Sequence, residues 1–455
     1  MKILQINCVY GTGSTGRLTQ AIHTRLLAEG IKSVVCCGRG PRSTDPHVHK
    51  VCGELYAKAQ HAEADLTGLV YGGCVLSTAR LLHILRREAP DIVHLQCING
   101  YFVNIFRLVR WLKRHRIPTL LTLHAEFPYT ANCGIAADCE KWRTGCGSCP
   151  QLRAQPGSLL FDRTAAAWKR MRDAFAGFSN CTVVSVSPWL RGRAEQAPVL
   201  AGLHHVTIGN GVETAVFHPM DAADLRQRYI SPGCRLVLHV TASFSPEQGS
   251  LKGGWYVLAL AKRMPDVTFA VVGNHEPLQN VPDNVLDIGR LEDPALLAAW
   301  YCAADAALLT SRRETFSLVT AESLCCGTPV VGFRAGGPES IAPPSCCEFV
   351  EYGDLDALEH ALRSWLEATP DRAAIAADAA ARFSMENMYH AYKLEYGTLL
   401  REGKVEKYNY DRFTASRIQT APGSRYRMQA VEYQVLSHLR KCFGRSKVFR
   451  FHSLG

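Results

Sequence analysis

Two glutamates stand eight residues apart in the segment 314-ETFSLVTAE-322, and this spacing suits a ligand with a diphosphate and a diol. A helix is predicted from about Ser317, which puts Glu322 one to two turns inside it and Glu314 in the preceding loop. Free amides at a helix N-terminus bind phosphate, and a carboxylate accepts two hydrogen bonds from a vicinal diol. The segment therefore predicts a nucleotide-sugar site. The alternative is a capping glutamate followed by an exposed helical one.

The stretch 11-GTGSTGR-17 follows an apolar run, and its glycines Gly11, Gly13 and Gly16 fit the G-x-G-x-x-G pattern of dinucleotide sites. A nicotinamide site also needs an acid at the end of the second strand, where this chain has 36-CCGRG-40. Only Arg39, as a partner for the 2′-phosphate of NADP, keeps that hypothesis open. The loop equally suits another anion or sugar, or a simple turn into a helix.

Four cysteines form a cluster in 133-CGIAADCEKWRTGCGSC-149, with the spacing C-x5-C-x6-C-x2-C. Four thiolates can make a closed tetrahedral zinc site. A structural zinc site and free thiols in a glycine-rich loop both remain open, whereas disulfides are not expected in the cytoplasm. The cluster consists of Cys133, Cys139, Cys146 and Cys149.

Two runs of alternating strands and helices must position these residues. The first is predicted to contain strands at 2–8, 32–37, 91–96, 119–123, 182–187 and 204–208, with helices at 17–29, 79–88 and 103–115. The second is predicted to contain strands at 235–241, 267–272, 285–288, 305–309 and 329–333, with helices at 254–263, 294–302 and 317–326. An apparent linker at 211–235 separates them, so we expect two doubly wound parallel-sheet lobes that face a ligand cleft.

Further motifs make the chain similar to the retaining glycosyltransferases of family four. The segment 314–322 resembles their E-x7-E signature, and 208-IGNGVETAVFHP-219 resembles their hinge segment. Lys252-Gly253 resembles their K-G, 335-AGGPE-339 their A-G-G-x-x-E loop, and 122-TLH-124 their T-x-H. The resemblance covers about residues 1–400 and implies the GT-B architecture of two Rossmann-like lobes.

The resemblance also implies roles for individual residues. Glu322 would bind the nucleotide ribose, Glu314 the donor sugar or its phosphate side, and Lys252 the diphosphate, whose departure it would assist. His124 would touch the donor sugar near the reaction centre. The remaining donor-side contacts are expected from the backbone of Phe316, Ser317 and Leu318 and from Gly13 and Ser14, and the acceptor-side contacts from Gly11, Gly16 and Arg17.

The chain departs from the family pattern in two places. The segment 241-TASFSPEQGSLKGG-254 lacks the arginine that usually precedes the lysine, and Ala125-Glu126 replaces an aspartate after the histidine. The cysteine cluster, in contrast, resembles a loop found in a branch of the family linked to surface polysaccharides. Because the cluster follows His124 directly, we expect it to shape the acceptor side.

No catalytic metal or other cofactor is expected. The D-x-D pattern at 354-DLD-356 fits a helix N-cap better than a metal site. Of the net charge of +10, the tail from Arg401 carries 12 − 4 = +8. This basic, aromatic tail is a candidate for an anionic membrane surface, whereas the helices at 79–88 and 107–116 fit ordinary solvated helices better. No nucleic-acid-binding module is recognised.

We therefore expect a glycosyltransferase that passes a sugar from a nucleotide sugar to a hydroxyl of a glycan or a lipid-linked acceptor, with retention, in surface or exopolysaccharide biosynthesis. It is expected in the cytoplasm, either free or peripheral on the inner membrane face. The alternatives are an NADP-dependent oxidoreductase and a non-catalytic homologue. The expected domains are an acceptor-side lobe at 1–211, a donor lobe at 212–384, a closing helix at 385–404 and a basic extension at 405–455.

Overall fold

The computed structural model describes residues 1–153, 157–275, 278 and 280–402. They contain two parallel sheets with strand orders β3-β2-β1-β4-β5-β6-β7 and β10-β9-β8-β11-β12-β13. The order reverses between β1 and β4 in the first sheet and between β8 and β11 in the second, and ligands bind beyond the carboxyl ends of strands at such points. The expected fold class, two doubly wound lobes, is confirmed, and the basic extension at 405–455 lies outside the described residues.

The first sheet, with its helices, forms the N-terminal lobe. Its strands are β1 (Lys2–Asn7), β2 (Lys32–Cys37), β3 (Val48–Lys50), β4 (Ile92–Leu95), β5 (Thr119–Leu123), β6 (Cys181–Ser185) and β7 (His204–Thr207). Its helices are α1 (Gly13–Ala28), α2 (Glu54–Thr67), α3 (Val75–Glu88), α4 (Ile105–Arg114), α5 (Phe127–Thr130), the 3-10 turn η1 (Lys141–Arg143), α6 (Thr164–Phe175) and α7 (Pro188–Glu195).

The second sheet forms the C-terminal lobe. Its strands are β8 (Arg235–Ser243), β9 (Val267–Asn274), β10 (Val285–Gly289), β11 (Ala306–Leu309), β12 (Val330–Phe333) and β13 (Cys347–Val350). Its helices are α8 (Ala223–Tyr229), α9 (Gly254–Arg263), α10 (Pro294–Ala303), α11 (Leu318–Cys325), α12 (Gly337–Ile341), α13 (Leu355–Glu367) and α14 (Arg372–Phe383), and α15 (Met385–Glu402) follows them.

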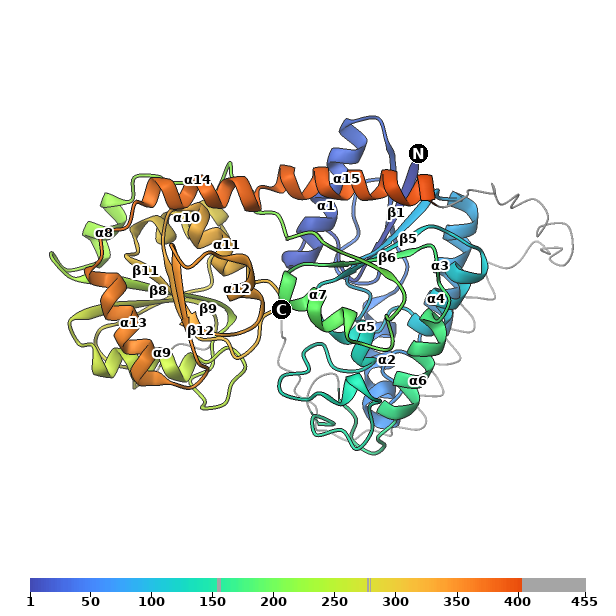
Figure 1. Ribbon diagram of the computed structural model, residues 1–455, viewed down its shortest axis with the longest axis horizontal. Helices are drawn as coiled ribbons and strands as arrows, with labels where there is room; N and C mark the ends of the chain where they lie inside the picture. Colours follow the sequence, from blue (N-terminus) through green and yellow to red (C-terminus); the bar gives the residue numbers. More distant parts are fainter. Residues whose placement is uncertain (154–156, 276–277, 279, 403–455) are drawn as a thin grey trace, which may run out of the picture. The chain divides into compact units, whose positions relative to one another are not determined.

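Helices cover both faces of each sheet, which explains why the central strands are buried along almost their whole length (Figure 1). In the C-terminal lobe, α9 and α13 pack on one face, and α10 and α11 lie on the other. In the N-terminal lobe, α3, α4 and α6 cover one face, while α1 and the closing helix α15 cover the other. The chain therefore returns to its first lobe at its last described helix.

The chain passes between the lobes twice, near Val212 and again near Ser384, and these two segments are hydrogen-bonded to each other. The Val212 amide donates to the carbonyl of Phe383 at 2.6 Å, and the Met385 amide donates to the carbonyl of Val212 at 2.9 Å. Gly211 permits this contact, because a Cβ there would lie 2.7 Å from the Cα of Met385. The hinge segment predicted from 208–219 is thus half of a paired crossing whose other half precedes α15.

One sequence-based expectation needs correction. The apparent linker at 211–235 contains the helix α8, whose short polar pattern did not stand out. Trp111 of α4 is buried in the core, with Arg86 stacked over its ring. This burial agrees with the interpretation of α4 as an ordinary crossover helix.

Candidate active site

The predicted site residues lie at the carboxyl ends of strands in both lobes. In the C-terminal lobe, Lys252 follows β8 and Glu314 follows β11, which are the two strands at the reversal point. In the N-terminal lobe, the glycine loop follows β1 and His124 follows β5. Parallel strands bring their carboxyl ends to one edge, so each lobe presents its candidate residues together.

Lys252 and Glu314 form an ion pair, with 2.6 Å between Nζ and Oε1. The lysine side chain is 33% exposed and the glutamate 19%, so both can reach a ligand. The Thr310 hydroxyl donates to the Lys252 carbonyl at 2.9 Å. Gly253, with φ near +66°, lets the chain pass so close to Thr310 that a Cβ would lie 2.2 Å from its carbonyl oxygen. The backbone at Lys252 is therefore fixed, while its ammonium points to the Glu314 carboxylate.

The loop that carries Glu314 pairs with the 335-AGGPE-339 loop. The Glu314 amide donates to the Ala335 carbonyl, and the Gly337 amide donates to the Glu314 carbonyl, each at 2.9 Å. A Cβ on Gly337 would lie 2.6 Å from the Phe316 nitrogen, so this contact requires glycine. The Glu339 carboxylate accepts from the Gly336 amide at 2.7 Å and completes the turn. Two motifs separated in sequence thus build one edge of the site.

In the turn before α11, the side chains of Phe316 and Ser317 make structural contacts within the protein. Ser317 has a φ near 80°, and its hydroxyl accepts from the Thr320 amide at 3.2 Å, which makes it the N-cap. The Phe316 ring is buried beside Gly209 and Phe383. Ligand contacts from Phe316, Ser317 and Leu318 would therefore come from the main chain, and they stay a prediction.

Glu322 is a mostly buried carboxyl group in the middle of α11. The Tyr301 hydroxyl donates to its Oε2 at 3.4 Å. Burial raises the pKa of Glu322 to about 7, against smaller lowering effects of the Tyr301 hydroxyl and the Arg17 charge. Arg17, at the start of α1 in the other lobe, is thus close enough to act on Glu322. A buried carboxyl group that is ready to lose its proton is suited to accept hydroxyl hydrogens from a ligand.

A chain of side-chain amides fixes the ring of His124. The Thr19 carbonyl can only accept, so the Gln5 amide nitrogen faces it at 3.3 Å. The Gln5 oxygen then accepts from the Gln96 nitrogen at 3.0 Å, and the Gln96 oxygen lies 2.9 Å from His124 Nε2. Burial lowers the pKa of His124 to about 4, so the ring is neutral at pH 7. His124 Nε2 therefore carries the proton, and Nδ1 is left as an acceptor.

The glycine loop forms a tight turn into α1. The Gly11 amide donates to the Gly16 carbonyl at 3.0 Å, and Gly11 and Gly13 have φ values of 71° and 63°. Ser14 is exposed and a Cβ on Gly13 would meet no atom within 4 Å, so this turn has open space beside it. The loop therefore has the form that close approach of a ligand requires.

Arg39, the candidate partner of an NADP phosphate, pairs with another residue. Its Nε lies 3.2 Å from Glu54 Oε2, and the same carboxylate accepts from the Gly40 amide at 2.8 Å. Arg39 thus supports the turn after β2. This pairing weakens the oxidoreductase hypothesis.

Several contacts between the lobes meet at the residues around Glu314. The Thr315 hydroxyl donates to the His124 carbonyl at 2.9 Å, and the Ser187 hydroxyl donates to the Thr315 carbonyl at 2.6 Å. Asp138 forms ion pairs with both Arg312 and Arg313, the latter at 3.4 Å. Sequence reasoning missed these contacts. In the sequence, the only hints of these contacts are the adjacent residues Arg312 and Arg313 before Glu314 and the acidic Asp138 beside Cys139.

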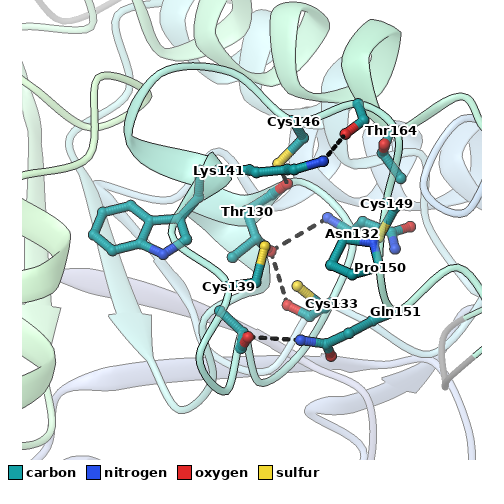
Figure 2. A pocket seen from close by; sticks show the side chains of 13 residues that line it. Thr130, Asn132, Cys133, Cys139, Lys141, Cys146, Cys149, Pro150, Gln151 and Thr164 are labelled. Carbon is teal, nitrogen blue, oxygen red and sulfur yellow. Dashed lines mark hydrogen bonds between the residues drawn. The ribbon is translucent and has the colours of Figure 1, made fainter.

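The four cysteines line one cavity in the N-terminal lobe, and Figure 2 shows them around it with Lys141. All four are free thiols. Burial raises the pKa of Cys133 and of Cys146 to about 12, and the neighbouring thiols add to both effects. The sequence cluster is therefore also a spatial cluster. Within the ranges that the structure describes, no group of three or more His, Cys, Asp or Glu side chains is arranged to hold a metal ion.

Glu126, one of the two departures from the family pattern, anchors this cysteine loop. Its carboxylate is fully buried and accepts from Arg193 Nε at 2.8 Å and from the Ala136 amide at 2.6 Å. Arg193 stacks over the rings of Trp142 and Trp189, 4.7 Å and 5.1 Å from their centroids. Glu126 thus has a structural role that ties the loop to α7.

Asp354 and Asp356 have structural partners, as the sequence indicated. Asp354 caps α13, where its carboxylate accepts from the Ala357 amide at 2.9 Å. Asp356 pairs with Arg263, 2.5 Å away. The interpretation of this D-x-D segment as a helix N-cap is confirmed.

Two family models match the chain: glycosyltransferase family 4 over residues 15–216 and glycosyl transferases group 1 over residues 255–368. The chain belongs to this family of glycosyltransferases. The two matches fall on the two lobes. The family membership decides between transferase and oxidoreductase, which Arg39 alone could not do.

Two named glycosyltransferases and one solved structure resemble the chain over most of its length. WcaC of Escherichia coli, named for glycosyl transfer in colanic acid biosynthesis, is 25% identical over 76% of this chain and 86% of its own. A GDP-mannose-dependent alpha-mannosyltransferase of Mycolicibacterium smegmatis is 29% identical over 69% of this chain and 72% of its own. HepE of Anabaena, solved with UDP-glucose, has the same fold, with a TM-score of 0.59 at 16% identity over 88% of this chain and all of its own. The described helices include none that is long and apolar enough to span a membrane.

Proposed function

We propose that this glycosyltransferase takes a sugar from a nucleoside-diphosphate sugar and passes it, with retention, to a hydroxyl of a glycan or a lipid-linked carrier during the synthesis of a surface or exopolysaccharide. The observation that carries the proposal is the arrangement of Glu322, α11 and Lys252. Glu322 is a mostly buried residue of α11, the N-terminus of this helix follows β11, and Lys252 follows the neighbouring strand β8. The carboxylate can accept hydrogen bonds from ribose hydroxyls, and the amides at the helix N-terminus can donate to a diphosphate. The lysine ammonium can balance the charge of the leaving group.

The chemistry follows from where charge develops. Departure of the diphosphate builds negative charge on its oxygens, which the Lys252 ammonium would stabilise. Glu314 holds this ammonium in place at 2.6 Å. The leaving phosphate would take the proton of the acceptor hydroxyl as the new bond forms on the same face of the sugar. The site then needs no nucleophilic carboxylate, and we propose that it uses no catalytic metal.

His124 would orient the donor sugar. Its ring is neutral at pH 7, because burial lowers its pKa to about 4, so it is not a proton donor for the leaving group. The Gln96 contact keeps the proton on Nε2, and Nδ1 can accept from a sugar hydroxyl. Gly13 and Ser14 approach the donor from the other lobe, and Gly11, Gly16 and Arg17 face the acceptor side in this proposal.

The acceptor class rests on the relatives and on the sequence. The name of WcaC refers to colanic acid, and this chain shares most of its length with that protein. A lipid-linked acceptor would bring the enzyme to the inner face of the cell membrane. The basic tail, which lies outside the described residues, is the candidate for that contact. Vesicle flotation with and without residues 405–455 tests it, and equal recovery of both forms from anionic vesicles would disprove it.

A thermal-shift screen of nucleoside-diphosphate sugars tests the donor class. Binding to the folded state raises the melting temperature, and at equal concentration the tighter-binding ligand raises it more, so one base and sugar should stand out. The selected donor is then incubated with acceptor candidates, and the anomeric configuration of the product is read by NMR. A product with the opposite configuration from the donor would contradict retention. A screen without any stabilising donor would contradict the site itself.

A further inference from the structure

The strongest unexplained feature is the cavity lined by four thiols, which the transfer reaction does not use. Cys133, Cys139, Cys146 and Cys149 reach it from one loop of the N-terminal lobe, as Figure 2 shows. None of them is in a disulfide. Four thiols around one small cavity are a donor set that suits a tetrahedral zinc ion in a closed structural site.

The surroundings of the cavity also fit such an ion. A zinc ion with four thiolates carries a net charge of −2, and Lys141 lines the same cavity. The Lys141 ammonium donates to the carbonyls of Gly147 and Ser148 at 3.0 Å and 2.7 Å, so it is held beside the last two cysteines. Trp142, buried behind the loop, accepts at its carbonyl from the Trp168 ring nitrogen at 3.1 Å. The loop is thus anchored on the side that faces the core.

The same loop reaches the residues that precede Glu314. Asp138 lies directly before Cys139 and pairs with Arg312 and Arg313 of the other lobe. The Arg312 amide donates to the Leu251 carbonyl at 2.9 Å, one residue before Lys252. A ligand that fixes the cysteine loop would therefore also fix its contact with Arg312 and Arg313, which lie next to the Lys252–Glu314 pair.

We propose that the four cysteines bind one zinc ion, which locks the loop 133–149 and thereby holds Asp138 against Arg312 and Arg313. In the structure no three of the described side chains already surround a metal position, so binding draws the sulfurs inward. Each bound thiol loses its proton to solvent, and four zinc–sulfur bonds replace four sulfur–hydrogen bonds. The coupling to the donor rests on the proposed function, whereas the zinc site does not.

Metal analysis of the full-length protein, purified without chelators, tests the zinc site. We expect about one zinc and no stoichiometric iron per chain, as a closed tetrathiolate site predicts. Cys139→Ser and Cys149→Ser should each retain less than about a fifth of that zinc, because structural sites need all four ligands. The matched control is Cys234→Ser, a half-buried thiol in the other lobe, which should keep its zinc.

Two results would overturn the zinc site: wild-type protein without zinc after growth in zinc-supplemented medium, or zinc that survives both cluster substitutions. If the variants do not fold, zinc release from the wild type is followed instead. A mercurial reagent that titrates thiols should release zinc in step with the four cluster thiols. Release that is unrelated to thiol titration would also overturn it.

Asp138→Asn tests the coupling separately. It should keep zinc and raise the donor KM about threefold, the size expected for partly exposed ion pairs, and zinc removal from the wild type should raise the KM similarly. An unchanged donor KM in Asp138→Asn with full zinc would overturn the coupling and leave the zinc site standing. Donor binding that is absent in the wild type as well would instead count against the proposed function.

Discussion

The environment of Glu322 changes its pKa, and this change bears directly on its proposed role in binding the donor ribose. Its carboxyl group lies within α11, near the Tyr301 hydroxyl and within reach of the Arg17 charge. Burial raises its pKa to about 7, so at neutral pH it is poised between its two forms. Only the ionised form accepts hydrogen bonds at both oxygens, which a ribose diol requires. Binding of the donor should therefore shift the proton equilibrium.

Donor binding should release a proton near pH 6.5. Hydroxyl groups that donate to Glu322 stabilise its ionised form and lower its pKa, so affinity rises as the pH increases towards about 7 and then levels off. Calorimetry in two buffers of different ionisation enthalpy measures the released proton. Glu322→Gln should bind the donor roughly tenfold more weakly and release none, since it loses a charged hydrogen bond. Wild-type binding without proton release would contradict this role.

Glu322→Gln should also stabilise the fold at high pH. A carboxyl group whose pKa is higher in the folded protein binds more protons when folded, so stability falls as the pH rises from 4.5 to about 7. The glutamine variant has no such loss and should gain about 2 kcal/mol in free energy of unfolding at pH 8, but little at pH 4. Urea denaturation at the two pH values measures it. An equal change at both would show that the charge is not the cause.

The strands β1, β4 and β5 each contribute to the relay of side chains that orients His124. Gln5 and Gln96 lie in or at the end of neighbouring strands, and their amides run from the Thr19 carbonyl on α1 to the His124 ring. Because a carbonyl begins the relay, the direction of every hydrogen bond in it is determined. The parallel pairing of β1 and β4 places Gln5 beside Gln96, and the resulting hydrogen bonds fix the tautomer of His124.

Gln96→Leu should lower kcat about tenfold, since an orienting hydrogen bond is lost, and should leave donor affinity within about twofold. Gln96→Glu restores an acceptor but places a charge beside the ring. It should therefore raise the pKa of His124 from its value of about 4 and add an acidic limb to the pH profile of kcat/KM. If Gln96→Leu turns over like the wild type, the relay has no part in the reaction.

The Glu126–Arg193 pair connects the cysteine loop to α7. The glutamate is fully buried and the arginine 11% exposed, so removal of the acid leaves Arg193 with Glu140, 2.9 Å away and about half-exposed, as its remaining acidic partner. Glu126→Ala should lower the free energy of unfolding by about 3 kcal/mol. The matched control is Glu195→Ala. Glu195 is an exposed residue of α7 that pairs with Arg191 at 2.8 Å, so its removal should lower the free energy of unfolding by less than about 0.5 kcal/mol. Comparable losses in urea denaturation would contradict a structural role for Glu126.

The two lobes and the local geometry of the candidate site segments were predictable from the sequence, because their signals are local. Apolar strand runs, the glycine turn at 11–16 and the capped helix after Ser317 each depend on residues close in sequence. The segment 335–339 was recognised through the family, but its pairing with Glu314 appears only in the structure. The structural role of Glu126 could not be read from the sequence, since burial against Arg193 leaves no local pattern.

Contacts between the lobes could not be predicted, because they join residues far apart in the chain. Asp138 meets Arg312 and Arg313 more than a hundred residues later, and Val212 meets Phe383 and Met385 across the paired crossing. Such pairs have no periodicity and no fixed spacing. They join the loops that carry the candidate site residues of the two lobes, so the candidate site depends on both lobes.

The rate of nucleoside-diphosphate release from the selected donor, in the presence of acceptor, tests the central claim most directly. Lys252→Ala and Glu322→Ala should each lower this rate roughly tenfold or more, since each loses a charged contact. Lys262→Ala, which removes an exposed lysine from α9, serves as the matched control and should react like the wild type. Equal rates in all four proteins would contradict a transfer site built from Lys252 and Glu322.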